Sequence, residues 1–205
     1  MSGHNPSDAG GDVARIGPNA ILQLIPVLDR AVGRTARDAL FAQAGVAVPP
    51  PDAGMLPETD IARLHHTLRQ TMPDQAAQLA REAGLATGDY ILANRIPALA
   101  QKVIRLLPKG LGSRILSGAI AKHSWTFAGS GDFTIVSLTP LTFEIAANPV
   151  VALDRAEAPI CDWHAAVFER LFTTLIWRQG VTVTETACCA RGDRACRFEL
   201  RPLTA

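Results

Sequence analysis

Four side chains in the last quarter of the chain have the chemistry of transition-metal ligands. Three are the cysteines Cys161, Cys188 and Cys196, and the fourth is the carboxylate of Glu185. Three thiolates and one carboxylate suit tetrahedral zinc, with Zn–S bonds of ~2.3 Å. Because the spacing contains no Cys-x-x-Cys pair, an alternative stays open, in which the cysteines are small buried apolar side chains of a reduced protein.

The residues around these four side chains indicate a helix followed by a β-hairpin. Apolar residues recur at three- and four-residue steps across residues 165–176, which is the period of a helix with one buried face. Residues 181–186 alternate as in a strand, residues 191–193 supply turn chemistry, and the alternation resumes over residues 196–200. Such a hairpin can bring the ends of its strands close to the start of the helix, at Cys161. The four candidate ligands can therefore converge.

Two further residues compete for places in this site. His164 lies one helical turn after Cys161 and is an alternative fourth ligand. Cys189 is adjacent to Cys188, and neighbouring residues of a strand point to opposite faces. At most one of these two cysteines is therefore expected to be a ligand.

These residues resemble the C-terminal signature of the 4-vinyl-reductase domain. That signature has a Cys, a helix with small and aromatic residues, Glu-x-x-Cys, a Gly-Asp turn and Cys-x-Phe. The matching residues are Cys161, Glu185, Cys188, Gly192, Asp193, Cys196 and Phe198. Related sensory domains with this signature bind zinc through the Cys, the Glu and the two later Cys. The resemblance implies a zinc site made of Cys161, Glu185, Cys188 and Cys196.

Length and composition bound the class of protein. The chain has 205 residues, of which 48% are hydrophobic and 19% charged, and this fits one domain with a sizeable core. A net charge of +1 gives no electrostatic reason to expect nucleic acid or an anionic membrane surface as a partner.

Uncharged runs and cysteine usage bound the location. The longest uncharged runs, residues 16–28 and 39–51, hold 13 residues each, short of the ~20 that span a bilayer. All four cysteines lie near the C-terminus, so a disulfide scaffold is not expected. We predict a cytoplasmic protein that does not span a membrane.

Hydrophobic periodicity predicts a helical first part and a β-rich second part. Residues 1–12 are expected to form a flexible tail, and residues 13–205 a single ligand-binding domain. Helices are predicted across residues 13–123, and the sheet and cysteine segment across residues 124–202. The predicted fold class is α+β, with a small antiparallel sheet packed with helices on one face.

Proline, glycine and aromatic positions give more local expectations. Pro26 should kink the first helix or divide it in two. Further helix breaks are expected at Pro97, Pro108 and residues 110–112. The strand pattern is expected to start at residues 125–127.

Two groups of titratable side chains stand out in the helical part. His65 and His66 are adjacent and diverge by about 100° on a helix, so they cannot face one ligand, and a solvated or rim position is expected. A basic face is either a solvated surface or a set of cations near a carboxylate-bearing ligand. It consists of Lys102, Arg105, Lys109, Arg114 and Lys122.

A wider resemblance covers roughly residues 14–202. Residues 14–33, residues 88–97 and the cysteine segment together are similar to the bacteriochlorophyll-biosynthesis protein J group, the 4-vinyl or 8-vinyl reductases. This implies the fold of the ligand-binding domain shared with nitric-oxide-signalling and Golgi-transport proteins. It also implies a role in bacteriochlorophyll formation with a vinyl-bearing magnesium tetrapyrrole as ligand.

Three functions follow as hypotheses. The favoured one is a carrier or accessory protein that binds a chlorophyllide- or protochlorophyllide-type pigment, alongside other bacteriochlorophyll-synthesis enzymes. The second is an 8-vinyl reductase that uses NADPH, with Tyr90 or a histidine as proton donor. Residues 110–118 (GLGSRILSG) do not fit a nucleotide-binding fingerprint, so no NADPH site is visible. The third is a ligand-sensing module.

Several binding residues can be suggested for such a pigment. The N-terminal helices are candidates for a homodimer interface. His123 and His164 are candidate magnesium ligands. Aromatic residues that would serve either as pocket walls or as ordinary core are Trp125, Phe127, Phe133, Phe143 and Trp177.

Overall fold

The structure is a computed structural model that describes residues 13–203. The predicted tail, residues 1–12, lies outside this range. Its helices are α1 (Asn19–Leu22), α2 (Leu24–Ala31), α3 (Gly33–Ala44), α4 (Glu58–Thr71), α5 (Pro73–Asn94), α6 (Ala98–Leu106), α7 (Lys109–Lys122), α8 (Trp125–Ala128) and α9 (Asp162–Leu175), with 3₁₀ helices η1 (Pro149–Val151) and η2 (Cys189–Arg191). Its strands are β1 (Arg15–Ile16), β2 (Leu56–Pro57), β3 (Asp132–Leu138), β4 (Leu141–Ala146), β5 (Val181–Ala187) and β6 (Ala195–Pro202).

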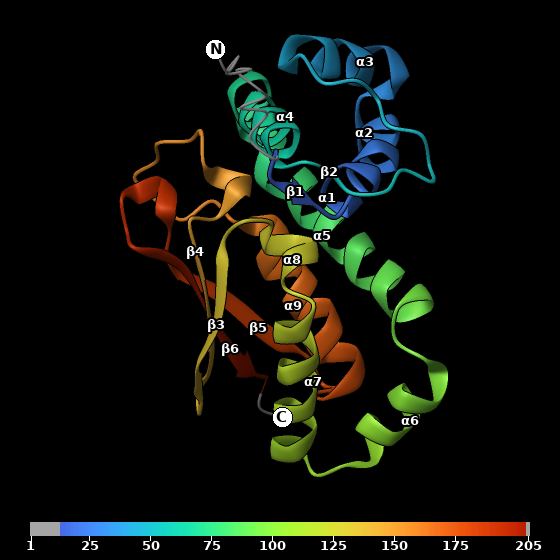
Figure 1. Cartoon of the computed structure of the whole chain (residues 1–205), viewed down its shortest axis with the longest axis vertical. Helices are drawn as coiled ribbons and strands as arrows, with labels where there is room; N and C mark the ends of the chain where they lie inside the picture. The colour runs from blue at the N-terminus through green and yellow to red at the C-terminus, as the bar shows by residue number, and fades with distance from the viewer. Residues whose placement is uncertain (1–12, 204–205) are drawn as a thin grey trace, which may run out of the picture.

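The molecule has a helical end and a sheet-containing end (Figure 1). Helices α1–α4 gather at the upper end of the view, where β1 and β2 form a short antiparallel pair. The other end holds a four-stranded antiparallel sheet of order β3-β4-β6-β5, with α9 beside it. This arrangement confirms the predicted α+β class with its small antiparallel sheet.

Aromatic rings join the sheet to α9. Phe143 on β4 pairs with Phe198 on β6, and both rings are fully buried. On α9, the rings of Phe168 and Phe172 lie 5.1 and 5.9 Å from that of Phe143. Tilted and edge-to-face contacts at these distances are favourable for aromatic rings. One face of the sheet is therefore sealed by α9.

Two glycines allow α5 to cross α9 closely. A Cβ atom at Gly84 would lie 2.4 Å from the carbonyl oxygen of Trp163, and one at Gly88 would lie 2.6 Å from Cβ of Arg170. Both distances are far shorter than a van der Waals contact, so only glycine fits at these positions. The crossing ties the helical end to the sheet-containing end.

The proline predictions hold, whereas the glycine break does not. The first helical segment divides at Gln23, and Pro26 occupies the third position of α2, where a helix has no use for the backbone N–H. Pro97 and Pro108 precede α6 and α7. Residues 110–112, in contrast, lie inside α7. Gly112 is used there for packing, because a Cβ would come within 3.1 Å of Ile176.

The prediction of a strand at residues 125–127 is wrong. This segment forms α8, in which the N–H groups of Phe127 and Ala128 both donate to the carbonyl oxygen of Ser124. The chain continues to coil after α7 and straightens only at Gly129, whose φ of 57° ends the helix. Local hydrogen bonding overrides the β propensity of the aromatic residues.

The rim position expected for the histidine pair is correct for one member only. His66 is partly exposed, and its Nδ1 lies 2.9 Å from Oδ1 of Asp154. His65 is fully buried, with Nε2 3.0 Å from the carbonyl oxygen of Ala20. Burial lowers the pKa of His65 to about 3, because the charged ring would lose its hydration. This side chain therefore fastens α4 to α1 in its neutral form.

The buried histidine should make the stability of the protein depend on pH. An unfolded histidine gains a proton near pH 6.5, but His65 in the folded state resists it, so stability is lost as pH falls below about 6.5. In His65→Gln, an amide can keep the bond to Ala20 without titrating. We expect the free energy of unfolding of wild type, measured by denaturant titration, to fall by about 2 kcal/mol more than that of His65→Gln between pH 7 and pH 5. Equal slopes for the two proteins would contradict this assignment.

Candidate metal centre and binding groove

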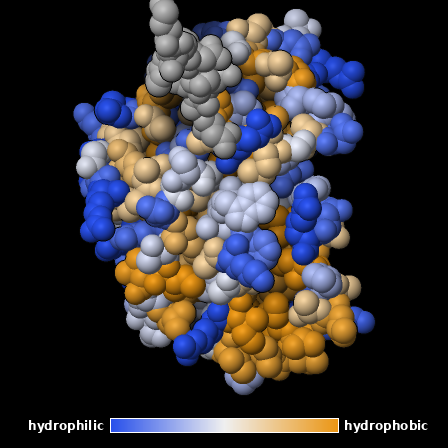
Figure 2. Space-filling view, in the orientation of Figure 1, coloured by the Kyte–Doolittle hydropathy of each residue, from blue (hydrophilic) through white to orange (hydrophobic). Residues whose placement is uncertain are grey.

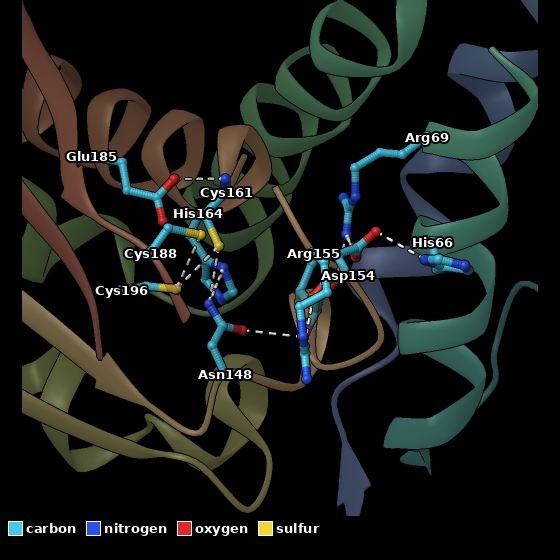
Figure 3. Close-up of polar contacts among 11 residues, drawn as sticks. His66, Arg69, Asn148, Asp154, Arg155, Cys161, His164, Glu185, Cys188 and Cys196 are labelled. Atoms are coloured by element: carbon cyan, nitrogen blue, oxygen red, sulfur yellow. Dashed lines mark hydrogen bonds and ion pairs between the residues drawn. The ribbon is translucent and has the colours of Figure 1, made fainter. Parts of the chain in front are cut away.

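The four predicted metal ligands meet at the start of α9 (Figure 3). Cys161 is the residue before α9, Glu185 lies in β5, Cys188 follows β5, and Cys196 lies in β6. One potential ligand atom from each residue lies within 4.8 Å of the other three. Cys161 and the three hairpin residues, which are 24 or more positions away from it in the sequence, thus converge as the predicted hairpin would allow.

The sulfur spacing suits a tetrahedral ion. The Sγ atoms of Cys161 and Cys196 are 3.6 Å apart, and those of Cys196 and Cys188 are 3.9 Å apart. A tetrahedral centre with Zn–S bonds of ~2.3 Å separates its sulfur ligands by about 3.8 Å. All the cysteines are free thiols. The donor set therefore has both the chemistry and the spacing for a zinc-like cation.

Irregular backbone at the hairpin end positions Cys188. The β5–β6 register shifts between Glu185 and Ala187, and a 3₁₀ turn follows, closed by Gly192 with φ 89°. The side chain of Asp193 accepts a hydrogen bond of 2.8 Å from the N–H of Cys188. The Gly-Asp pair of the sequence signature thus holds the turn that carries a ligand.

Hydrogen bonds from outside the four ligands support negative charge on them. Asn148 Nδ2 donates to Sγ of Cys161 over 3.1 Å, and the N–H of Cys189 donates to Sγ of Cys196 over 3.3 Å. The N–H of Cys161 donates to Oε2 of Glu185 over 2.7 Å. Such outer contacts fix the orientation of ligands at metal sites.

The electrostatics of the cluster call for a cation. Burial raises the pKa of Cys161 well above its ordinary value and that of Glu185 to about 8. The neighbouring thiols of Cys161 and Cys196 donate to Cys188 and lower its pKa, so one negative charge is shared within the cluster. The second oxygen of Glu185, Oε1, is buried without a hydrogen-bond partner in the described structure. A divalent ion would supply that partner and balance the thiolates.

The two rival ligands lie outside this group. Nε2 of His164 lies 3.1 Å from the carbonyl oxygen of Phe127, and its Nδ1 lies 3.4 Å from Nδ2 of Asn148. Both ring nitrogens are therefore engaged, and the ring is buried, which argues against His164 as a magnesium ligand as well. Sγ of Cys189 instead lies 3.8 Å from the carbonyl oxygen of Ile145.

Sequence analysis did not identify Asn148 as part of the site. Its Oδ1 accepts the N–H of Val150 over 3.1 Å and so caps η1, while its Nδ2 faces Cys161. An Asn immediately before a Pro is a turn signal, and this signal located the loop. The contact with a residue 13 positions away depends on how that loop folds back.

A separate groove lies between α7 and β3. It has a volume of about 390 Å³ and is lined by Arg114, Gly118, Ile135, Val136, Ser137 and Leu138. The β3–β4 register shifts between Ile135 and Ser137, so Val136 is the extra residue of a bulge on this edge strand. A Cβ added at Gly118 would meet nothing within 4 Å, which leaves open space over this face of α7.

The suggested aromatic pocket walls do not line this groove. Phe127 and Phe133 pack against each other at 5.4 Å, and Phe133 packs against Phe143 at 5.2 Å. Trp177 stacks on Phe172, and Trp125 is half exposed. The interpretation of Phe127, Phe133, Phe143 and Trp177 as ordinary core packing is the one that fits.

Comparison with known proteins was made for the sequence and for the fold. Residues 141–202 match the 4-vinyl-reductase domain family. The chain is 62% identical over 204 residues to the bacteriochlorophyll synthase 23 kDa chain of Cereibacter sphaeroides, covering 98% of each. It is 55% identical over 202 residues to the protein of the same name in Rhodobacter capsulatus, covering 98% of this chain and 93% of that one.

The fold is similar to that of H-NOX proteins. An Fe(II) unliganded H-NOX variant from K. algicida superimposes with a TM-score of 0.59, covering 92% of this chain and 97% of that one at 8% identity. At this identity the match establishes a shared fold. It confirms the predicted fold of the nitric-oxide-signalling type.

Asn148 provides a test of how the cluster is held. In Asn148→Asp the cap of η1 is retained, but a carboxylate replaces the N–H donor that faces Cys161. We expect the free energy of unfolding to fall by about 1–3 kcal/mol, because a buried acceptor then faces sulfur without a donor. Asn94→Asp is the matched control, since Asn94 is exposed and donates only to the carbonyl oxygen of Tyr90; it should cost less than about 1 kcal/mol. Equal losses would show that Asn148 has no special role.

Proposed function

The chain belongs to the family of the bacteriochlorophyll synthase 23 kDa chains, and from this membership we propose that it binds a vinyl-bearing magnesium tetrapyrrole, a precursor in bacteriochlorophyll biosynthesis. The family predicted from the sequence is thus confirmed, and the protein carries a 4-vinyl-reductase domain. Its proposed role is that of a carrier or accessory protein for the pigment.

The groove between α7 and β3 is the observation that supports pigment binding. Its volume of about 390 Å³ lies within the range of about 300–1,000 Å³ that is usual for small-molecule pockets. Ile135, Val136 and Leu138 give it an apolar wall, and Gly118 leaves room for a flat ring. Arg114 supplies one cation at the same place. A chlorophyllide-type pigment combines a flat apolar macrocycle with a carboxylate, which matches these features.

The lining of the groove favours binding over reduction. Among its lining residues, Arg114 is the only titratable side chain, and an arginine does not give up its proton in proteins. Tyr90, the proton donor suggested for a reductase, is on α5, where its hydroxyl accepts a hydrogen bond of 3.3 Å from Arg95. Vinyl reduction also needs a hydride donor such as NADPH held against the substrate. We therefore place the carrier role ahead of the 8-vinyl reductase and the ligand-sensing module.

A pigment titration tests the carrier role. Purified protein is titrated with divinyl chlorophyllide or its protochlorophyllide precursor, with and without NADPH, followed by absorption spectroscopy and pigment chromatography. We expect a saturable spectral shift and recovery of unchanged pigment. Arg114→Glu should weaken binding about tenfold, because charge repulsion replaces an ion pair. Gly118→Leu should abolish binding by filling the open space.

Controls separate a specific groove from a general effect. Arg34→Glu changes an exposed arginine on α3 and should bind pigment like wild type. Conversion to the 8-ethyl product only with NADPH would favour the reductase. Wild-type affinity in both groove variants would move the pigment elsewhere.

Zinc is the second part of the proposal. Cys161, Glu185, Cys188 and Cys196 would hold the ion, and Asn148 and Cys189 N–H would orient two of the thiolates. Support comes from the sulfur spacing and from the unpartnered oxygen of Glu185. The chemistry that zinc would supply here is structural, since four protein ligands complete a tetrahedral shell. It would join the start of α9 to both strands of the C-terminal hairpin.

Cysteine variants test the zinc site. Cys188→Ser should lose stoichiometric zinc, measured by elemental analysis, and its Tm should fall by more than about 10 °C. This expectation takes a loss of several kcal/mol and about 2–4 °C per kcal/mol for a domain of this size. Cys189→Ser is the matched control and should keep both zinc and Tm. A fully folded wild type without zinc would overturn the proposal, and metal loss in Cys189→Ser would reassign the ligand.

A further inference from the structure

The small net charge of the chain conceals a strongly cationic segment. Residues 90–131 contain six Lys or Arg residues and no Asp or Glu, although the whole chain carries only +1. Among residues 13–203, none of these six side chains forms an ion pair with a carboxylate. The segment spans α6, α7 and α8. Its charge is therefore available to an external partner.

Helix α6 directs most of its apolar side chains away from the protein. Leu99, Val103 and Leu106 follow one another at positions i, i+4 and i+7, and so share one face of the helix. Leu99 is 74% exposed and Leu106 is 86% exposed, whereas Ile104 is the one buried residue of α6. An ordinary surface helix has the opposite arrangement, with its apolar stripe on the core.

The exposed stripe continues onto α7. Leu111 and Ile115, one turn apart on α7, are also exposed. Figure 2 shows a contiguous hydrophobic area at the end of the molecule where Figure 1 places α6 and α7. An exposed apolar patch beside cations marks an interaction surface.

The cations lie on the same two helices. Lys102 is exposed on α6. Arg105 donates to the carbonyl oxygen of Thr174, and Lys109 donates to that of Ile176, so both stand at the C-terminal end of α9. Arg114 is exposed on α7 beside the apolar stripe. Apolar and cationic side chains thus present one combined surface.

We propose that α6 and the first turns of α7 form a docking surface for an anionic lipid bilayer. The apolar stripe would enter the interface between headgroups and acyl chains, and the cations would meet the phosphates, as in interfacial amphipathic helices. A second copy of this chain is a poorer occupant. A two-fold contact through this surface would oppose the same cations from both subunits, with no acid in the segment to offset them.

The surface borders the groove between α7 and β3, since Arg114 belongs to both. Docking would hold the groove beside a bilayer, where an amphiphilic ligand dissolves. The docking proposal does not rest on pigment binding and is tested with pigment-free protein. Failure of either proposal would leave the other standing.

Vesicle flotation is the test. Wild-type protein should float with phosphatidylcholine vesicles that contain half phosphatidylglycerol and should stay unbound with pure phosphatidylcholine. Binding should disappear between about 0.1 M and about 1 M salt, where the Debye length falls from about 10 Å to about 3 Å. Lys102→Glu and the double variant Leu99→Ser/Leu106→Ser should each lower the partition coefficient about tenfold or more.

Matched controls come from exposed residues elsewhere. Leu153→Ser removes an exposed leucine outside α6 and α7, and Arg34→Glu reverses an exposed charge on α3; both should bind like wild type. Circular dichroism confirms that each variant is folded. Equal binding to neutral and anionic vesicles, or none to either, would overturn the proposal. A wild-type dimer in light scattering that Leu99→Ser/Leu106→Ser abolishes would assign the surface to self-association instead.

Discussion

The sheet-containing end of this protein depends on the burial of three thiols and a carboxylate at one point. Such a group is costly in a protein interior, because each charge that forms must be balanced where water is excluded. The chain meets this demand with hydrogen-bond donors from Asn148 and from backbone N–H groups, and it leaves one carboxylate oxygen of Glu185 unpartnered. The proposed zinc ion completes that balance. The arrangement then acts as a clasp, since its members come from the start of α9 and from both strands of the hairpin.

The rest of the fold is arranged so that ligand binding does not compete with this clasp. The aromatic rings between the sheet and α9 form a closed core, whose contacts are too dense to admit a macrocycle. The open groove lies instead at the edge strand β3, where a bulge and the bare backbone of Gly118 leave space. A structural metal site and a binding groove can therefore coexist in one small α+β unit. The close α5–α9 crossing keeps both on a common frame.

Charge and apolar surface are distributed unevenly over the molecule. The acid-free segment from 90 to 131 lies on α6, α7 and α8, and it borders the groove. For a protein that handles an amphiphilic pigment, this placement is physically coherent, because such a ligand partitions into membranes and carries a carboxylate. No helix among residues 13–203 is long and apolar enough to cross a bilayer. Contact at the surface of a bilayer uses a different property, the outward stripe of α6.

The sequence by itself determined what local patterns and side-chain chemistry can determine. The two-residue alternation of 181–186 and 196–200 predicted the hairpin, the apolar period before it predicted α9, and the donor types of Cys161, Glu185, Cys188 and Cys196 predicted their convergence. Pro97 and Pro108 marked helix starts, because proline acts on its own backbone. Other features depended on residues distant in the chain. His65 is buried because Ala20 offers it a carbonyl, Gly112 stays helical because α7 must approach Ile176, and Asn148 joins the cluster through a loop that folds back. Only the tertiary structure could decide these, since the partner that fixes each one lies outside its local sequence.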